Sequence, residues 1–481
     1  MPLNPSFLKL NKKPLLIAFI STFLYWVFAY NLVRTEYIKL ITLYTGLFLL
    51  FYTIIKCLKH NTKALSFLAF GFRAIFILAI PNLSQDFYRF IWDGRMILEG
   101  FNPYLYTVES FINLGEYPIA EALELRKGMG ALNASHFTNY PPINQICFLI
   151  AAIFSSKSII GSVVIMRLLI IAADFGTLHF GKKLLDKLNL PDYNIYWYIL
   201  NPFIIIELTG NLHFEGVMIF FLVWSLYLLH IGKSYWAAIM LALSISVKLI
   251  PLIFLPLFFQ WFVARNNIKH QIRQSPNKRV TTASYTPRNN VITGLARLIG
   301  FYAIIFLIIL LLFTPFYSPE FINNYSSTVA LWFQTFEFNA SIYYIARSIG
   351  YAFRGYNEIA IIGKITPIIV ILFVIGLTFL RKKITTKQLI TAMLLALSFY
   401  YFTASTVHPW YIATLVVLSV FTKYRFPLVW SYIIILSYLA YINLNQSDKS
   451  ENLWIISLEY LTIYSFFIWE VFIKKASKME A

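Results

Sequence analysis

The feature that most constrains this chain is a series of uninterrupted apolar runs, several of them as long as a bilayer is thick. A helix needs about 20 apolar residues to cross the hydrocarbon core. Runs of this length cover residues 15–33, 298–315, 359–380 and 453–473. Backbone polar groups inside lipid must be satisfied within the segment, so each run is expected to be a helix. Charged residues make up only 13% of the chain, well below the share usual in soluble domains. The sequence therefore predicts an all-α polytopic membrane protein.

The distribution of positive charge predicts how the chain is threaded. The 40 basic residues exceed the 21 acidic ones, and most of the excess lies in short connectors between apolar runs. This is the bias of cytoplasmic loops, not the continuous basic surface of a nucleic-acid-binding protein, so no nucleic-acid partner is expected. The connectors contain Lys9, Lys12 and Lys13; Lys56, Lys59 and Lys63; Lys182, Lys183 and Lys187; Arg381, Lys382, Lys383 and Lys387; Lys423 and Arg425; and Lys474, Lys475 and Lys478.

Placing these connectors inside gives about 12–13 transmembrane helices. Short or broken helices are expected within 141–180 and 234–263, where prolines interrupt the apolar runs. Amphipathic helices are expected in the first outer loop. The predicted parts are a transmembrane hairpin (1–63), a module with an acidic outer loop at 82–142 (64–263), a basic cytoplasmic loop (264–297), and a C-terminal transmembrane region with an outer loop at 317–357 (298–481).

Two carboxylates and two arginines lie just after the predicted third helix. Asp86, Arg89, Asp93 and Arg95 are costly to place beside a membrane without a function. A carboxylate there can deprotonate an acceptor hydroxyl, and arginines can hold a phosphate. This pairing favours an enzyme that acts on a lipid-linked phosphate. The alternatives are an interfacial helix with snorkelling arginines, and a structural salt bridge from Asp93 to one of the arginines.

Further polar residues are predicted to reach the same outer face. Lys248 stands alone in an apolar run, so it needs an anionic partner such as phosphate, or must snorkel to the head groups. His213 and Glu215 lie in a helix–helix turn; two candidate ligands are too few for a metal site, and no metal is expected. Glu215 can face a helix N-terminus or a substrate hydroxyl.

The sequence His408-Pro409-Trp410-Tyr411 begins a later predicted crossing from the outer side. His408 can hydrogen-bond a lipid phosphate. Trp410 and Tyr411 can stack on a sugar or mark the membrane interface, and interfacial aromatic belts favour the second interpretation.

Several short motifs follow one another over residues 84–256, with a weaker echo at 405–411. Their order resembles that of membrane-embedded GT-C glycosyltransferases, most closely the polyprenyl-phosphate-mannose-dependent mannosyltransferases, a branch that includes PIG-M-like enzymes and bacterial members. The motifs are Ser84-Gln85-Asp86, Trp92-Asp93-Gly94-Arg95, Gly100-Phe101-Asn102-Pro103-Tyr104, Tyr140-Pro141-Pro142, Asp174, Asn201-Pro202, Gly210-Asn211 with Glu215, and Val247-Lys248-Leu249-Ile250-Pro251.

The resemblance implies a GT-C-type helical bundle whose catalytic module is 64–263. It also implies an enzyme that moves a sugar, mannose by analogy, from a polyprenyl-phosphate donor to a lipid-linked or cell-envelope glycan, with inversion and without a cofactor. Asp86 takes the place of the catalytic base, with Asp93 as the second candidate. Where the family often has Asp-x-Asp, this chain has Ser84-Gln85-Asp86, which weakens the case for a metal. The predicted substrate contacts are Arg89, Arg95, Tyr140, His213, Glu215, Lys248, His408, Trp410 and Tyr411.

The predicted location is a bacterial inner membrane, with the site facing the periplasm. One alternative function is a flippase or transporter of lipid-linked saccharide, which predicts charges near the bilayer midplane and inverted repeats. Another is an O-antigen-type polymerase, which predicts arginines in the later outer loop. That loop, 317–357, contains only Arg347 and Arg354.

Overall fold

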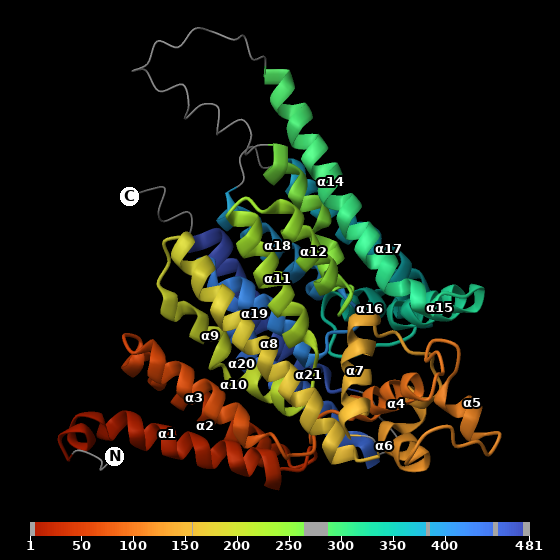
Figure 1. Cartoon of the computed structure of the whole chain (residues 1–481), viewed down its shortest axis with the longest axis horizontal. Helices are drawn as coiled ribbons and strands as arrows, with labels where there is room; N and C mark the ends of the chain where they lie inside the picture. The colour runs from red at the N-terminus through yellow and green to blue at the C-terminus, as the bar shows by residue number, and fades with distance from the viewer. Residues whose placement is uncertain (1–4, 156, 264–286, 381–384, 446–450, 475–481) are drawn as a thin grey trace.

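The computed structural model describes residues 5–155, 157–263, 287–380, 385–445 and 451–474. In these ranges every regular element is a helix, apart from one isolated bridge between Phe338 and Thr406. The long helices form a bundle, and α1, α2 and α3 lie together at one side of it (Figure 1). The predicted all-α polytopic fold is confirmed.

The N-terminal half contains most of the short and broken elements. Its elements are α1 (Pro5–Asn31), α2 (Tyr37–Leu58), α3 (Thr62–Ile75), α4 (Asp86–Leu98), α5 (Val108–Ile112), α6 (Ala122–Ala134), α7 (Pro142–Ser155), α8 (Ile159–Lys187), η1 (Asp192–Ile195), α9 (Tyr196–Ile199), α10 (Pro202–Ile204), the π-helix η2 (Ile205–Gly210), α11 (Glu215–His230), α12 (Ser234–Ile245) and η3 (Ile250–Leu257).

The C-terminal half continues the bundle and adds two helices in the second predicted outer loop. Its elements are α14 (Pro287–Phe313), η4 (Thr314–Phe316), α15 (Pro319–Gln334), α16 (Ile342–Arg354), α17 (Ile359–Phe379), α18 (Thr386–Thr403), η5 (Pro409–Tyr411), α19 (Ile412–Val420), α20 (Phe426–Ile433), η6 (Ile434–Asn445), α21 (Leu453–Ile468) and the π-helix η7 (Trp469–Ile473).

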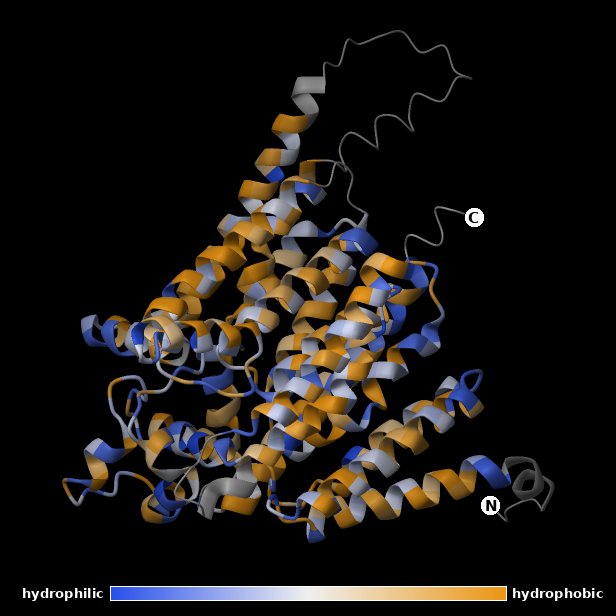
Figure 2. Ribbon diagram, turned by 180° about the vertical axis from the view of Figure 1, so that it is seen from behind, coloured by the Kyte–Doolittle hydropathy of each residue, from blue (hydrophilic) through white to orange (hydrophobic). Residues whose placement is uncertain are grey.

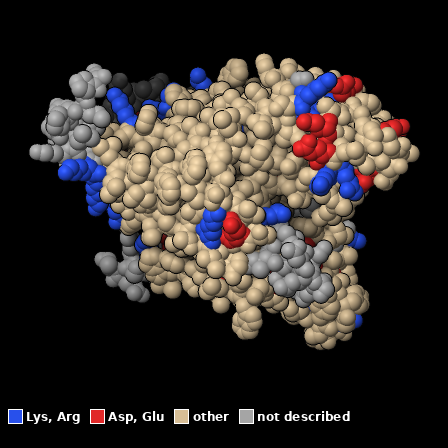
Figure 3. Space-filling view, turned by 90° about the horizontal axis from the view of Figure 1, so that it is seen from below, with Lys and Arg blue, Asp and Glu red and all other residues tan. Residues whose placement is uncertain are grey.

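Fewer helices than expected are long enough to cross a membrane. Among the described residues six qualify by length and composition, or seven if the pair 202–210 and 215–230, bent by 116°, counts as one span. The other predicted crossings are shorter apolar helices such as Pro142–Ser155 and Ser234–Ile245. The predicted 12–13 crossings include short and broken helices that this length criterion does not count, because prolines and polar turns divide the apolar runs, so the number of crossings stays a prediction. Apolar residues dominate the long helices (Figure 2), and the surface seen in Figure 3 is mostly uncharged.

The predicted breaks in the apolar runs are confirmed. Pro142 begins α7, a separate helix before the long α8. Helix α12 ends before Lys248, and η3 begins after it. The predicted cytoplasmic loop is only partly observable, because 264–286 lie outside the described residues. Its last residues, 287–297, are helical and form the start of α14.

Helix α4 is packed into the protein, and its charged residues Arg89, Asp93 and Arg95 are all buried. Gly94 allows this packing: a Cβ placed there would be 2.2 Å from the Phe148 carbonyl oxygen of α7. On the other flank, a Cβ at Gly128 of α6 would be 2.6 Å from the Tyr88 ring. The interpretation of Arg89 and Arg95 as snorkelling arginines is therefore wrong, because both are buried, and α4 is held between α6 and α7.

The buried guanidinium of Arg167 fixes the position of the break between η2 and α11. Arg167 of α8 donates hydrogen bonds to the carbonyls of Thr209 (2.8 Å), Gly210 (2.9 Å) and Ile77 (2.9 Å). These carbonyls belong to the end of η2 and to the segment after α3, where a helix end leaves acceptors without intrahelical partners. The turn that carries His213 and Glu215 is thus anchored to the core of the bundle.

Candidate active site

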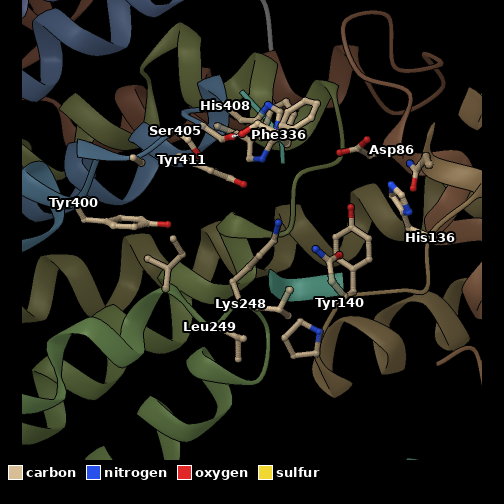
Figure 4. Close-up of a pocket in the computed structure, with 18 of the residues that line it drawn as sticks. Asp86, His136, Tyr140, Lys248, Leu249, Phe336, Tyr400, Ser405, His408 and Tyr411 are labelled. Atoms are coloured by element: carbon tan, nitrogen blue, oxygen red, sulfur yellow. Dashed lines mark hydrogen bonds between the residues drawn. The ribbon is translucent and has the colours of Figure 1, made fainter. Parts of the chain in front are cut away.

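A cavity of about 710 Å³ lies where α4, the α12–η3 junction and η5 come together (Figure 4). Seven of the predicted site residues line it: Asp86, Arg89, Tyr140, Lys248, His408, Trp410 and Tyr411. The other four, Asp93, Arg95, His213 and Glu215, do not line it, although His213 and Glu215 contact residues that do. Segments that are far apart in the sequence therefore share one cavity.

Asp86 is the first residue of α4, and its carboxylate points toward the cavity (Figure 4). Within the described residues it forms no ion pair. Burial raises the pKa of Asp86 to about 6, with Glu215 adding to the rise and Lys248 opposing it. A carboxyl with a pKa near the working pH is suited to general base catalysis, because it is ionised and still a useful proton acceptor.

Lys248 lies in the interruption between α12 and η3, where its side chain extends toward the cavity (Figure 4). Its Nζ atom is 3.0 Å from Glu215 Oε1 and 5.3 Å from the centroid of the Tyr140 ring. The expectation of a lysine without a protein partner is therefore wrong, and snorkelling is not needed to explain it. Glu215, the first residue of α11, is its counter-ion and keeps a second buried oxygen, Oε2, that has no hydrogen-bond partner among the described residues.

His408 belongs to a stack of aromatic rings in the cavity wall. Its ring centroid lies 4.6 Å from that of Trp410 and 5.1 Å from that of Phe338, and the His213 ring also stacks on Trp410, at 3.7 Å. Burial lowers the pKa of His408 to about 3, so the ring is neutral near pH 7 and can offer a hydrogen bond but not a charge. Trp410 is 8% exposed, which contradicts the preferred interpretation of it as an interface marker. Tyr411 also faces the cavity (Figure 4), so the same interpretation is wrong for it.

The remaining charged residues of α4 are used inside the protein. Arg89 Nε donates to Asp93 Oδ1 at 2.8 Å, and Arg89 Nη1 donates to the carbonyls of Asn133 and His136. Gln145 donates to the other Asp93 oxygen at 3.1 Å. Asp93 therefore forms the predicted structural salt bridge, and its position away from the cavity does not favour it as a base.

Arg95 is 2% exposed and donates to the Ala120 carbonyl (2.7 Å) and to Glu121 (3.0 Å). Both Arg95 and Arg89 are buried in the protein. Arg95 links α4 to the segment before α6 and does not reach the cavity, so the geometry does not favour it as a phosphate ligand.

The second predicted outer loop contributes a wall that the sequence did not reveal. Phe338 N–H donates to the Ser405 carbonyl (3.1 Å) and Val407 N–H to the Phe338 carbonyl (2.8 Å), which pairs this loop with the segment before His408. Phe336, Tyr400 and Ser405 line the cavity, as does His136 from the first loop. For the wall formed by Tyr400 and Ser405, the nearest sequence motif was the weaker family resemblance at 405–411.

Metal ligands are not grouped in the part of the chain that the structure describes: no set of three or more His, Cys, Asp or Glu side chains is placed to hold an ion.

Comparison with known families gives one match. Residues 17–265 match the family described as Alpha-(1->6)-mannopyranosyltransferase, N-terminal domain, which is 249 of the 481 residues. The matched part includes Asp86, Tyr140, Glu215 and Lys248 and ends before His408. No curated protein matches the chain.

Proposed function

This chain belongs to the alpha-(1->6)-mannopyranosyltransferase family, and we propose that it transfers mannose from a polyprenyl-phosphate donor to a hydroxyl of a glycan acceptor. It is a GT-C mannosyltransferase with apolar helices that suit a bilayer. The acceptor in this proposal is a lipid-linked or cell-envelope glycan, and the membrane is a bacterial inner membrane with the cavity facing the periplasm. The positive-inside pattern of the connectors supports that orientation.

The observation that carries the proposal is the meeting of Asp86 and Lys248 at one cavity. One supplies a carboxylate with a pKa of about 6 and the other a cation, the two groups that transfer from a sugar phosphate needs. His408 adds a neutral ring whose Nδ1 is buried and has no hydrogen-bond partner among the described residues.

The lining of the cavity supports a donor with a long apolar tail. On one side it is polar, with Ser84, Gln85, Asn133, His136 and Asn139. On the other it is apolar, with Leu252, Ile253, Pro367, Val370 and Ile371 from η3 and α17. A polyprenyl chain matches the apolar wall, and a hydroxyl-rich glycan matches the polar one.

The proposed reaction proceeds in one displacement. The acceptor hydroxyl gives its proton to Asp86 while its oxygen forms a bond to C1 of mannose. The bond between C1 and the phosphate oxygen breaks, and its electron pair leaves with polyprenyl phosphate. The Lys248 ammonium stabilises the charge that develops on the phosphate, and Asp86 then releases its proton to water. Attack opposite the leaving group inverts the configuration at C1.

The test uses purified protein in lipid nanodiscs with a panel of radiolabelled polyprenyl-phosphate sugars. We expect mannose transfer by the wild type and a 10²- to 10⁴-fold lower rate for Asp86→Asn, the range that loss of a positioned base usually costs. Glu116→Gln, which removes an exposed carboxylate from the same loop, is the matched control and should remain active.

The possible outcomes separate the parts of the proposal. Full activity of a folded Asp86→Asn protein would remove Asp86 as the base. Transfer of a different sugar, or transfer from a nucleotide sugar only, would overturn the donor. The family assignment favours this function over a flippase or an O-antigen-type polymerase.

A further inference from the structure

A second cavity, of about 700 Å³, lies between the end of α2, η1 and the start of α20. It shares no lining residue with the active-site cavity. Its walls come from elements that the proposed reaction does not use, so it needs its own explanation. Apart from Asn194, the lining residues are basic or apolar and aromatic, and the basic ones are separated in space from most of the others.

The basic residues are Lys56, Lys59 and Arg425, and no acidic residue lines the cavity. None of the three forms an ion pair within the described residues. Lys56 and Lys59 are exposed. Glu470 lies next to Arg425, but its Oε2 accepts the backbone N–H groups of Arg425 (2.6 Å) and Phe426 (2.9 Å).

The Arg425 guanidinium keeps most of its donors for another partner. Within the described residues the guanidinium donates one hydrogen bond, from Nη1 to the Ser419 carbonyl, and this bond is long at 3.4 Å. A guanidinium has five N–H donors, so a half-buried one with so few bonds favours an anionic ligand.

The apolar residues lie on one side of the basic ones along both helices. Along α2, Phe48, Phe51, Tyr52 and Ile55 come first and the two lysines follow at the helix end. A helix rises about 1.5 Å per residue, so Phe48 at the far end of the apolar wall is about 12 Å along the helix from Lys56 and about 16 Å from Lys59.

Along α20 the order is reversed. Arg425 comes first, and Leu428, Val429 and Tyr432 follow. Phe48 and Tyr432 pack edge to face at 5.1 Å, so the two apolar walls meet. Both helices therefore place cations at the same end of the cavity and apolar side chains deeper along it.

We infer that this cavity binds an anionic phospholipid from the leaflet on the basic side of the protein, with its phosphate at Lys56, Lys59 and Arg425 and an acyl chain along Phe48, Leu428 and Tyr432. The arrangement matches an amphiphile: a free phosphate would leave the apolar wall unused. Three cations in a cavity with no acidic lining residue favour a head group with net negative charge over a zwitterionic one, since basic residues near an anionic membrane surface each add about 1 kcal/mol. The inference does not depend on the proposed transferase reaction.

The experiment measures lipid retention by the full-length protein in native mass spectrometry, with phosphatidylglycerol and phosphatidylcholine of identical chains. We expect the wild type to retain phosphatidylglycerol in preference. Lys56→Gln/Lys59→Gln should lower that retention about 30-fold, as the loss of two such charges implies. Lys12→Gln/Lys13→Gln removes two exposed lysines outside the cavity and is the matched control.

A second readout locates the lipid. Trp197 lines the cavity, so phosphatidylglycerol with brominated acyl chains should quench part of the tryptophan fluorescence of the wild type and less of that of Trp197→Phe. Equal retention of the two lipids, an equal loss in the control variant, or quenching unchanged by Trp197→Phe would overturn the inference. Displacement of phosphatidylglycerol by inorganic phosphate, or by polyprenyl phosphate at lower concentration, would show that the occupant is not a phospholipid.

Discussion

Two carboxylates on the same helix, Asp86 and Asp93, are two turns apart and have opposite surroundings. Asp93 is fully buried and is held by Arg89 at 2.8 Å and Gln145 at 3.1 Å. Asp86 is at the start of α4, faces the cavity, and forms no ion pair within the described residues. The two carboxylates are therefore not equivalent: the buried one, whose oxygens are already bonded within the protein, serves the fold, and the half-buried one at the cavity is free to accept a proton from a ligand.

The largest expected effect tests the structural side of this comparison. Asp93→Ala leaves Arg89 as a buried cation without its carboxylate, which typically costs about 3–5 kcal/mol. We expect a large fall in the thermal unfolding temperature in detergent. Asp86→Asn removes a charge that burial disfavours, so its stability should be equal to or above that of the wild type. A stable Asp93→Ala protein, or an equally unstable Asp86→Asn protein, would contradict the comparison.

The next effect concerns the cation opposite Asp86. Lys248→Met should lower mannose transfer by about 10²- to 10³-fold, as loss of a positioned electrostatic group does. It should also destabilise the protein, because Glu215, 3% exposed, then lacks a counter-ion. Adding Glu215→Gln should restore the unfolding temperature but not the transfer rate. Recovery of both would mean that Lys248 has only a structural role.

Close packing of α4 gives a smaller effect. Gly94→Ala would place a Cβ against the Phe148 carbonyl, and overpacking of this kind usually costs about 1–3 kcal/mol. The unfolding temperature should fall. The transfer rate of the folded protein should fall only if the shift of α4 also displaces Asp86. Gly71→Ala is the control, because a Cβ there meets no neighbour within 4 Å. Gly100→Ala is less suitable, because Gly100 has a positive φ that disfavours alanine.

The smallest effect is on pH dependence. The pKa of Asp86 is raised from an ordinary 3.8 to about 6, so transfer should be constant above pH 6 and fall about tenfold for each pH unit below it. The folded state binds this proton more tightly than the unfolded state does, so the Asp86 contribution to stability should increase as the pH falls from about 6 toward 4. A rate profile with no inflection between pH 5 and 7 would contradict Asp86 as the base.

The fold was predictable where the apolar runs are long and was less so where they are interrupted. Runs such as 359–380 have one structural solution in lipid, and α17 matches it closely. The segment from Pro202 to His230 is bent by 116°, and a hydropathy pattern contains no information about the direction in which a chain continues after a break. The number of crossings was therefore the weakest part of the prediction.

The site was predictable as a set of residues but not as a set of contacts. Asp86, Tyr140, Lys248 and His408 do line one cavity. The pairing of Lys248 with Glu215 joins positions with no periodic relation, so only the tertiary fold brings them together. The burial of Arg89 was missed for a similar reason, because its partners include backbone carbonyls at and just after the end of α6, and backbone acceptors leave no trace in the sequence.

The pairing of residues 336–338 with 405–407 has a consequence for how the chain can be divided. The matched family region ends at residue 265, yet one side of the cavity and the ring of His408 come from beyond it. A fragment that ends at residue 265 would keep the proposed base, Asp86, and the cation, Lys248, but would lack the cavity wall that the later residues form. Exchanging the downstream portion between two relatives would keep the proposed base and replace the α17 residues of the apolar wall, so the preference for the lipid tail and the chemical step can be altered separately.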